Sequence, residues 1–260
     1  MDIIDLGDEF VPAYLCCLED WSPDMQDAGD HKRRWFEHMK DRGLRVKLAV
    51  EDGKACGMIQ YLPVEHADIS GSNLYFIYCI WVHGHKQGIG NHQRRGMGTA
   101  LLAAAEADAR HLGAHGMAAW GILLPFWMKA AWFRKHGYQP VDRNGISQLL
   151  WKPFTSNATP AEWIRQKKQP ESIPGKVTVT AFLNGWCPAM NITFERAKRA
   201  AAEFGDAVIF REIDTLDRQV FLEWGIADGL FINGRQVNTG PPPSYAKLRG
   251  MIEKHVRRVK

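Results

Sequence analysis

The sequence has little cysteine, and its spacing fits neither a disulfide framework nor a zinc site. Five cysteines occur in 260 residues. The number is odd, and no two have the C-x-x-C spacing that is typical of structural zinc sites and dithiol redox motifs. A disulfide-stapled secreted fold is therefore not expected, and the cysteine usage favours a reducing compartment. The five residues are Cys16, Cys17, Cys56, Cys79 and Cys187.

Long apolar runs and a strong net charge are also lacking. No apolar run reaches the roughly 20 residues that a membrane-spanning helix needs, and the acidic start MDIIDLGDEF lacks the layout of a signal peptide. The 33 basic and 29 acidic residues leave a net charge of +4, which is too mild to indicate nucleic-acid binding. We therefore expect a cytoplasmic globular protein that binds neither nucleic acid nor membrane, with its oligomeric state left open.

Four prolines between Lys152 and Gly175 indicate a linker that divides the chain. The sequence therefore predicts one domain over residues 1–153, a linker over 154–174 and a second domain over 175–260. Within the linker, Thr159-Pro160-Ala161-Glu162 matches a capping box with proline at the first helical position. This pattern predicts a short linking helix through Trp163 and Ile164.

The first part of the chain mixes strand-like and helix-like patterns, which predicts an α/β (α+β) fold. Apolar runs on both sides of Asp52-Gly53 predict a β-hairpin, and the β-branched and aromatic run over 73–82 predicts a buried strand. Further strands are expected over 2–6, 115–121 and 147–154, and helices over 9–20, 31–43, 98–112 and 125–137.

The expected helix after Gly98 has one apolar face, formed by leucines and alanines at helical spacing. The polar residues between them are expected to point to solvent; they are Glu106, Asp108 and Arg110. Gly113 is expected to end this helix.

The stretch HQRRGMGTALL places two glycines and two arginines between the strand and this helix. Free backbone N–H groups gather at the start of a helix, and its dipole adds partial positive charge there. Glycine at Gly96 and Gly98 allows close approach of a ligand, and Arg94 and Arg95 suit phosphate. The loop has neither the G-K-[ST] of a P-loop nor the G-x-G-x-x-G of a dinucleotide fold. It therefore predicts a phosphate-binding loop of another kind.

Gln93-Arg94-Arg95-Gly96-Met97-Gly98 resembles the acetyl-CoA loop of the GNAT N-acetyltransferases, whose pattern is Arg or Gln, two residues, Gly, one residue, then Gly or Ala. CIWV stands where that family has its cofactor-contacting strand, and WFRKHGY where it has an aromatic pair before Gly-Tyr. The resemblance covers roughly residues 1 to 153. It implies a GNAT acyltransferase fold that uses acetyl-CoA as co-substrate and transfers the acetyl group directly to an amine.

The resemblance also implies roles for particular residues. Backbone N–H groups from Arg94 to Thr99 would hold the pyrophosphate. Ile80 and Val82 would pair with the pantetheine arm, and one such N–H would polarise the thioester carbonyl. The implied cofactor-binding residues are Ile80, Val82, Gln93, Arg94, Arg95, Gly96, Met97, Gly98 and Thr99.

The sequence departs from the family pattern where catalytic groups are concerned. Phe133 replaces the tyrosine that many members use as an acid toward the leaving thiolate, and Phe126 replaces an asparagine near the start of that helix. The loop between Val82 and Gln93 is several residues longer than usual. Catalysis is therefore expected to use other groups.

Histidines in the long loop are the candidates for that role. His83 or His85 could act as a general base, because histidine titrates near neutral pH; both could also be surface histidines. A Cys-His-His metal site with Cys79 and His92 is conceivable, but the spacing is no recognised zinc signature, so no metal is expected. Four tryptophans fall near the expected cleft as core or as ligand contacts: Trp81, Trp120, Trp127 and Trp132.

The second part has the order β-α-β-α-β-β-α and resembles a small thioredoxin-like domain, with Trp186-Cys187-Pro188 at the redox turn. Met190 replaces the second cysteine, which argues against dithiol chemistry. Cys187 precedes a helix that would favour its thiolate, so it is either a reactive monothiol or a remnant in a domain that shapes a pocket. The combination of both parts resembles the YoaP-like acetyltransferases.

The sequence as a whole predicts an acetyl-CoA-dependent N-acetyltransferase that acts on a small amine-bearing molecule. The candidate catalytic residues are His83, His85 and Cys187. The alternative is a thiol-based binding or sensing module whose acetyltransferase domain binds CoA but is degenerate.

Overall fold

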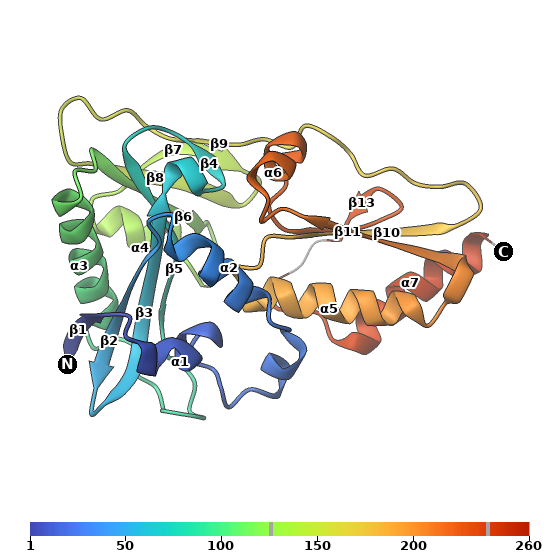
Figure 1. Ribbon diagram of the computed structural model, residues 1–260, viewed down its shortest axis with the longest axis horizontal. Helices are drawn as coiled ribbons and strands as arrows, with labels where there is room; N and C mark the ends of the chain where they lie inside the picture. Colours follow the sequence, from blue (N-terminus) through green and yellow to red (C-terminus); the bar gives the residue numbers. More distant parts are fainter. Residues whose placement is uncertain (125–126, 238–239, 260) are drawn as a thin grey trace. The chain divides into compact units, whose positions relative to one another are not determined.

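The structure is a computed structural model, and it describes residues 1–124, 127–237 and 240–259. The chain forms two compact units. The first comprises Met1–Trp21 and Glu37–Ile164, and the second comprises Ser22–Phe36 and Arg165–Lys260 (Figure 1). The second unit is therefore discontinuous in sequence, a feature that the predicted continuous domains do not contain.

The first unit is built on a seven-stranded sheet with the order β1-β2-β3-β5-β6-β8-β7. All neighbouring strands are antiparallel except β5 and β6, which are parallel. The strands are β1 (Asp2–Asp5), β2 (Arg45–Glu51), β3 (Lys54–Pro63), β5 (Leu74–Val82), β6 (Gly116–Ile122), β7 (Gln139–Asn144) and β8 (Ser147–Pro153). The helices are α1 (Val11–Leu15), α3 (Met97–His111) and α4 (Ala130–Lys135), with 3-10 turns at Asp8–Phe10 and Val64–His66.

The hairpin between β2 and β3 confirms the prediction made from Asp52-Gly53. Both residues have positive φ, 51° and 72°. A two-residue type I′ turn needs this geometry at both central positions, which is why Asn-Gly and Asp-Gly favour it.

Two helices predicted near the end of the first unit differ in the structure. The linking helix through Trp163 does not form; instead β9 (Glu162–Trp163) pairs with β4 (Ile69–Ser70), with Ile69 opposite Trp163. Pairing with a distant strand outweighed the local capping signal. The helix expected over 125–137 is reduced to α4, and its first two residues lie outside the described part of the chain.

Helix α3 packs its apolar face against the sheet as expected, with Leu101, Leu102, Ala105 and Ala109 in the core. The prediction that Glu106 and Asp108 face solvent was wrong. Glu106 is only 7% exposed and accepts hydrogen bonds from Lys152 Nζ at 2.8 and 3.0 Å. Asp108 accepts from Arg45 at 2.9 and 3.0 Å and from the Tyr61 hydroxyl at 2.6 Å. Partners from β2, β3 and β8 thus allow these carboxylates to lie against the sheet.

These partners make the contribution of Asp108 to stability depend on pH. Burial alone would raise its pKa, but hydrogen bonds from Arg45 and Tyr61 hold the pKa below its ordinary value. A carboxyl group with a lowered folded-state pKa stabilises the fold above its unfolded pKa, and this contribution is lost as the pH falls through the folded one. We expect Asp108→Asn to lower the free energy of unfolding at pH 7, and the difference from wild type to shrink below about pH 4. Urea denaturation at pH 7 and pH 3 checks this; equal differences at both would contradict it.

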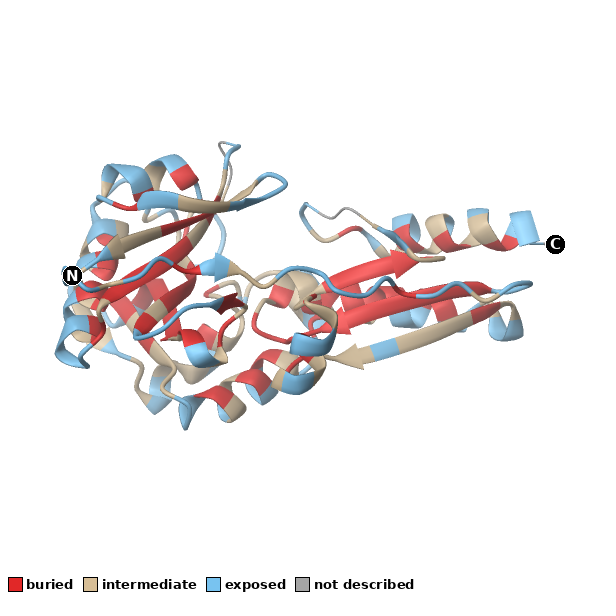
Figure 2. Ribbon diagram, turned by 90° about the horizontal axis from the view of Figure 1, so that it is seen from above, coloured by how far each residue is buried: buried red, intermediate tan, exposed pale blue. Residues whose placement is uncertain are grey.

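The second unit has a four-stranded sheet with the order β11-β10-β12-β13, in which only β10 and β11 are parallel. Its elements confirm the predicted order β-α-β-α-β-β-α: β10 (Val177–Leu183), α5 (Pro188–Ala202), β11 (Val208–Asp214), α6 (Arg218–Trp224), β12 (Gly229–Ile232), β13 (Arg235–Gln236) and α7 (Tyr245–Val259). Helices α5 and α7 lie on one side of this sheet and α6 on the other (Figure 1). Every residue of β10 is therefore buried, as Figure 2 shows.

Residues Ser22–Phe36 belong to the second unit through a group of ionic contacts with α5. Arg196 is buried and donates from Nε to Asp27 at 2.8 Å, from Nη2 to Asp24, and from Nη1 to the carbonyl of Pro243. The hydrogen bond from Arg196 lowers the pKa of Asp27 most. His31 Nε2 lies 2.7 Å from Glu195 Oε1. These contacts hold the 3-10 turn Pro23–Asp27 and the start of α2 (His31–Lys40) to the unit.

Candidate active site

Strands β5 and β6 pair over only part of their length. In the described part of the chain, their pairing runs from Leu74 opposite Gly116 to Ile77 opposite Ala119 and then ends. A β-bulge begins at the next residue, because Gln60 pairs with Cys79 while the following residue of β3 pairs with Ile77. The remainder of β5, as far as Val82, therefore has an edge without a neighbouring strand.

The backbone groups on this edge can be assigned from the pairing on the other side of β5. The N–H of His83 donates to the carbonyl of Cys56 in β3. Since backbone groups alternate along a strand, those of Val82 and Ile80 face away from β3. The carbonyl of Val82 accepts from Gln93 Nε2 at 3.1 Å, so the glycine loop begins directly beside this edge.

The glycine loop leads into α3 through residues with positive φ. Arg94 has a φ of 63° and Gly96, which precedes the first helical residue, a φ of 84°. Only glycine adopts such a φ without a steric cost. The first helical hydrogen bond runs from Ala100 N–H to the Gly96 carbonyl. The N–H groups of Met97, Gly98 and Thr99 therefore have no acceptor within the helix and can serve an anion.

A cavity of about 430 Å³ lies between the edge of β5, the glycine loop and the segment before α4. Eight of the nine predicted cofactor-binding residues line it: Ile80, Val82, Gln93, Arg94, Gly96, Met97, Gly98 and Thr99. The structure therefore brings together residues that the sequence analysis predicted on a strand, in a loop and on a helix. The remaining lining residues are Trp81, His92, Trp127, Met128, Lys129, Trp132 and Phe133.

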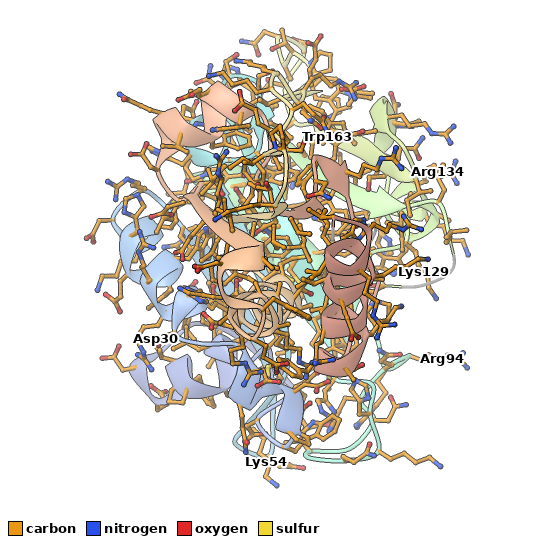
Figure 3. The ribbon with its side chains drawn as sticks, turned by 90° about the vertical axis from the view of Figure 1, so that its right-hand side faces the viewer. Asp30, Lys54, Arg94, Lys129, Arg134 and Trp163 are labelled. Carbon is orange, nitrogen blue, oxygen red and sulfur yellow. The ribbon has the colours of Figure 1, made fainter. Side chains whose placement is uncertain are left out.

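The ninth predicted residue, Arg95, points elsewhere. Its guanidinium binds both carboxylate oxygens of Glu51, at 2.8 and 2.9 Å, and lies 3.1 Å from His92 Nδ1. The Arg94 side chain is exposed and points outward (Figure 3). Among the described residues, no acidic side chain pairs with Arg94. Arg94 is therefore the arginine whose charge remains available to a ligand phosphate.

This difference gives a prediction with a matched control. We expect Arg94→Ala to weaken acetyl-CoA binding by about tenfold, because it removes a charge-assisted contact. Arg95→Ala should change the affinity by less than about threefold, because its charge is already neutralised by Glu51. Calorimetric titration of both variants checks this. A larger loss for Arg95→Ala than for Arg94→Ala would contradict the assignment.

The candidate histidines differ in their surroundings. His83 is fully buried; its Nε2 accepts from Trp21 Nε1 at 2.9 Å, and its Nδ1 lies 2.6 Å from the carbonyl of Gly90, to which it donates. The side chain of His85 is 43% exposed, and its Nε2 lies 3.4 Å from Glu19 Oε1. Within the described residues, no three His, Cys, Asp or Glu side chains are grouped as a metal site.

Some of the aromatic residues singled out in the sequence line the cavity, and others pack in the core. Trp81, Trp127 and Trp132 line the cavity, whereas Trp120 packs behind it, edge-on to Trp127 with ring centroids 5.2 Å apart, and donates to the Tyr78 carbonyl. Phe133 lines the cavity and is otherwise buried. Phe126 lies outside the described residues.

Cys187 lies in the second unit, not in the unit that contains the cavity. It occupies the N-cap position of α5 in an extended conformation and is partly buried. None of the five cysteines, all of which lie in described parts of the chain, forms a disulfide.

The sequence analysis missed Glu19 and Trp21. Both contact histidines that lie more than sixty positions later in the chain: Glu19 contacts His85, and Trp21 contacts His83. No local motif marks either residue, and only the packing of the N-terminal segment on the sheet brings them to the end of β5.

Among the described residues, no helix is both long and apolar enough to span a membrane.

Comparison with solved structures finds acetyltransferases that match about three fifths of this chain over at least 90% of their own length. The chain is 13% identical to the PaiA N-acetyltransferase of Thermoplasma acidophilum in complex with coenzyme A, covering 59% of this chain and 100% of that one, with a TM-score of 0.44. The ribosomal-protein-alanine N-acetyltransferase of Brucella melitensis is 17% identical, with 59% and 100% covered and a TM-score of 0.44. A GNAT family acetyltransferase of Brucella melitensis in complex with acetyl-CoA is 16% identical, with 61% and 90% covered and a TM-score of 0.39.

A search of curated proteins found no match to the chain. A comparison with family profiles did find a match. The profile of the acetyltransferase (GNAT) family matches residues 5–138, which include β5, the glycine loop, α3 and α4. The resemblance stated from the glycine loop is thereby confirmed. The chain belongs to the GNAT acetyltransferase family and is an acyltransferase with acetyl-CoA as its co-substrate.

Proposed function

We propose that acetyl-CoA binds in the cavity beside β5 and that the acetyl group passes directly to a small amine. The observation that carries this proposal is the cavity itself, which joins the unpaired edge of β5 to the N-terminus of α3. The N–H groups from Arg94 to Thr99 would hold the pyrophosphate. The backbone of Ile80 and Val82 would hydrogen-bond the pantetheine arm as a neighbouring strand does.

In this proposal the thioester carbonyl lies against the edge of β5. A backbone N–H there would stabilise the negative charge that develops on its oxygen as the amine attacks. The amine must first lose a proton to a general base, for which His83 and His85 at the end of β5 are the candidates. Phe133 has no hydroxyl group, so the proton that reaches the departing thiolate must come from another source.

The second unit is proposed to be thioredoxin-like, and the whole chain to be a YoaP-like acetyltransferase. Support comes from the strand order β11-β10-β12-β13 and from Trp186-Cys187-Pro188 directly before α5. Without a second cysteine at Met190, a redox cycle at Cys187 would need an external thiol. We favour a remnant or pocket-shaping role for Cys187 over a reactive one. A cytoplasmic location, supported by the cysteine usage, is part of the same proposal.

The alternative function is thiol-based binding or sensing with a degenerate acetyltransferase domain. The position of Cys187 at the N-terminus of a 15-residue helix favours it, because the helix dipole stabilises a thiolate. It predicts cofactor binding without turnover.

Thiol release from acetyl-CoA distinguishes the two functions. The full-length protein is assayed with a panel of primary amines: 2-phenylethylamine, spermidine, glucosamine and a peptide with a free N-terminus. We expect steady release with at least one of them, and a product heavier by one acetyl group in mass spectrometry. Binding of acetyl-CoA with no release above the amine-free rate would favour the sensing function. Abolished turnover in Cys187→Ser with intact cofactor binding would contradict the remnant role.

A further inference from the structure

The two faces of β5 are covered by different elements. Gly57 of β3 pairs with Val82, and a Cβ placed at Gly57 would meet Leu101 of α3; Val82 therefore faces α3. Gln60 pairs with Cys79, and the Gln60 side chain accepts from the Tyr14 hydroxyl of α1 at 2.8 Å. Figure 1 shows α3 and α1 on opposite sides of the sheet. Because side chains alternate along a strand, Trp81 and His83 lie on the α1 face with Cys79.

The α1 face is the side from which an amine can approach the edge of β5. Helix α3 covers the opposite face, and its N-terminus and glycine loop are where the phosphates would lie. Trp81 lines the cavity although its side chain belongs to the α1 face. The cavity therefore reaches β5 at Trp81, the residue whose side chain lies on the α1 face.

Three side chains are grouped beside Trp81 on this face. His85 lies with its ring centroid 6.1 Å from that of Trp81 and 5.1 Å from that of Trp21. Glu19 lies 3.4 Å from His85 Nε2, and its side chain is 22% exposed. The group thus combines two indole faces, which attract a cationic amine, with an imidazole and a carboxylate.

Hydrogen bonds hold the neighbouring His83 in one tautomer. Its Nδ1 proton is donated to the Gly90 carbonyl, and its Nε2 lone pair accepts from Trp21. A base needs a lone pair that can reach the substrate, and His83 has none available. The buried His83 instead fixes the indole of Trp21, which packs against His85.

We propose that His85 is the general base for the acceptor amine and that Glu19 is the positioning residue that orients it, an inference that rests on the proposed acetyltransferase function. His85 Nε2 lies 3.4 Å from Glu19 Oε1; with its proton on Nε2, facing the carboxylate, His85 has Nδ1 left to accept a proton from the ammonium group. This arrangement of a carboxylate behind a basic imidazole fixes the tautomer and stabilises the imidazolium that forms.

The resulting transfer balances in protons and electrons. His85 Nδ1 takes one proton from the ammonium, and the nitrogen lone pair attacks the thioester carbon. A C–N bond forms and the C–S bond breaks, so the electron pair leaves with the CoA sulfur. The second proton of the attacking nitrogen ends on that sulfur, which gives an amide and a thiol. His85 then releases the first proton to water.

The charged and titratable groups that face His85 are Glu19, which follows α1, and His83 at the end of β5. Burial raises the pKa of Glu19, while the adjacent His85 and His83 lower it. The carboxylate form of Glu19 thus depends on its histidine neighbours, and activity should fall on the acid side once Glu19 is protonated.

The test uses the full-length protein with the fastest amine of the panel above. We expect His85→Ala to lower kcat/KM about 100-fold at pH 7 and Glu19→Gln about tenfold, which is in the range of general-base effects. At pH 9.5 more of the amine is unprotonated, so the deficit of His85→Ala should shrink below about tenfold. Added imidazole should restore part of its activity at pH 7. The control Lys86→Ala, an exposed neighbour in the same loop, should match wild type.

Acetyl-CoA affinity, measured by calorimetry, separates a catalytic role from a structural one. It should be unchanged in His85→Ala, His85→Asn and Glu19→Gln. A His85→Ala variant that is fully active, or has the same deficit at both pH values and no rescue by imidazole, overturns the proposal. Loss of cofactor binding in both His85 variants also overturns it. If wild type itself turns over no amine, the proposed function fails, and this outcome is distinct from an active wild type with an equally active His85→Ala.

Discussion

Replacing Gly98 by leucine is expected to weaken acetyl-CoA binding by roughly 10- to 100-fold, since overpacking of a formed site costs about 1–3 kcal/mol. A Cβ at Gly98 would lie 3.5 Å from Trp132 and 4.0 Å from Val82, two residues that line the cavity. The remaining atoms of leucine must therefore occupy space that the cofactor needs. Calorimetric titration with acetyl-CoA measures the loss.

Gly98→Ala is the matched control for this substitution. Its single methyl group would make only ordinary van der Waals contacts, so the affinity should stay within about threefold of wild type. Gly98 is within α3 and has no positive φ. Both substitutions should therefore preserve or raise thermal stability through their higher helix propensity. Unchanged affinity in Gly98→Leu would show that acetyl-CoA does not lie between Trp132 and Val82.

Arg196→Ala is expected to destabilise the second unit by about 3 kcal/mol, the range seen when one partner of a buried ion pair is removed. The Arg196 side chain is only 8% exposed and binds Asp24 and Asp27. Its removal leaves Asp27 without its main partner and frees the turn Pro23–Asp27 from α5. The free energy of unfolding in urea measures the effect.

Arg199→Ala tests whether burial is the cause. Arg199 also binds Asp27, at 2.7 Å, but its side chain is 52% exposed. Exposed ion pairs contribute little, so a loss below about 1 kcal/mol is expected. Equal losses in the two variants would mean that the segment 22–36 is not held to the second unit through the buried Arg196.

The core of the candidate site could be predicted because its signals are local. The apolar run of β5, the glycines of the loop and the helical spacing of Leu101 and Leu102 are adjacent in sequence. Each element could be assigned by itself, and their order predicted the cavity. The positive φ of Gly96 is likewise what a glycine before a helix suggests.

Features that depend on distant partners could not be predicted. Asp27 and Arg196 are 169 positions apart, so nothing near Asp27 marks it as part of the second unit. Arg94 and Arg95 look alike in sequence, and only Glu51 on β2 distinguishes them. Glu106 and Asp108 looked solvent-exposed because their partners come from other strands. In each case the missing information was a tertiary contact.

Hydrogen exchange with and without acetyl-CoA tests most directly whether the edge of β5 and the start of α3 hold the cofactor. Binding should place new acceptors on the N–H groups of Ile80, Val82 and residues 97–99, which have none within their own elements. We expect slower exchange in the peptides that contain these residues when acetyl-CoA is added to the full-length protein. Unchanged exchange there at saturating acetyl-CoA, or protection confined to residues 165–260, would contradict this placement of the cofactor.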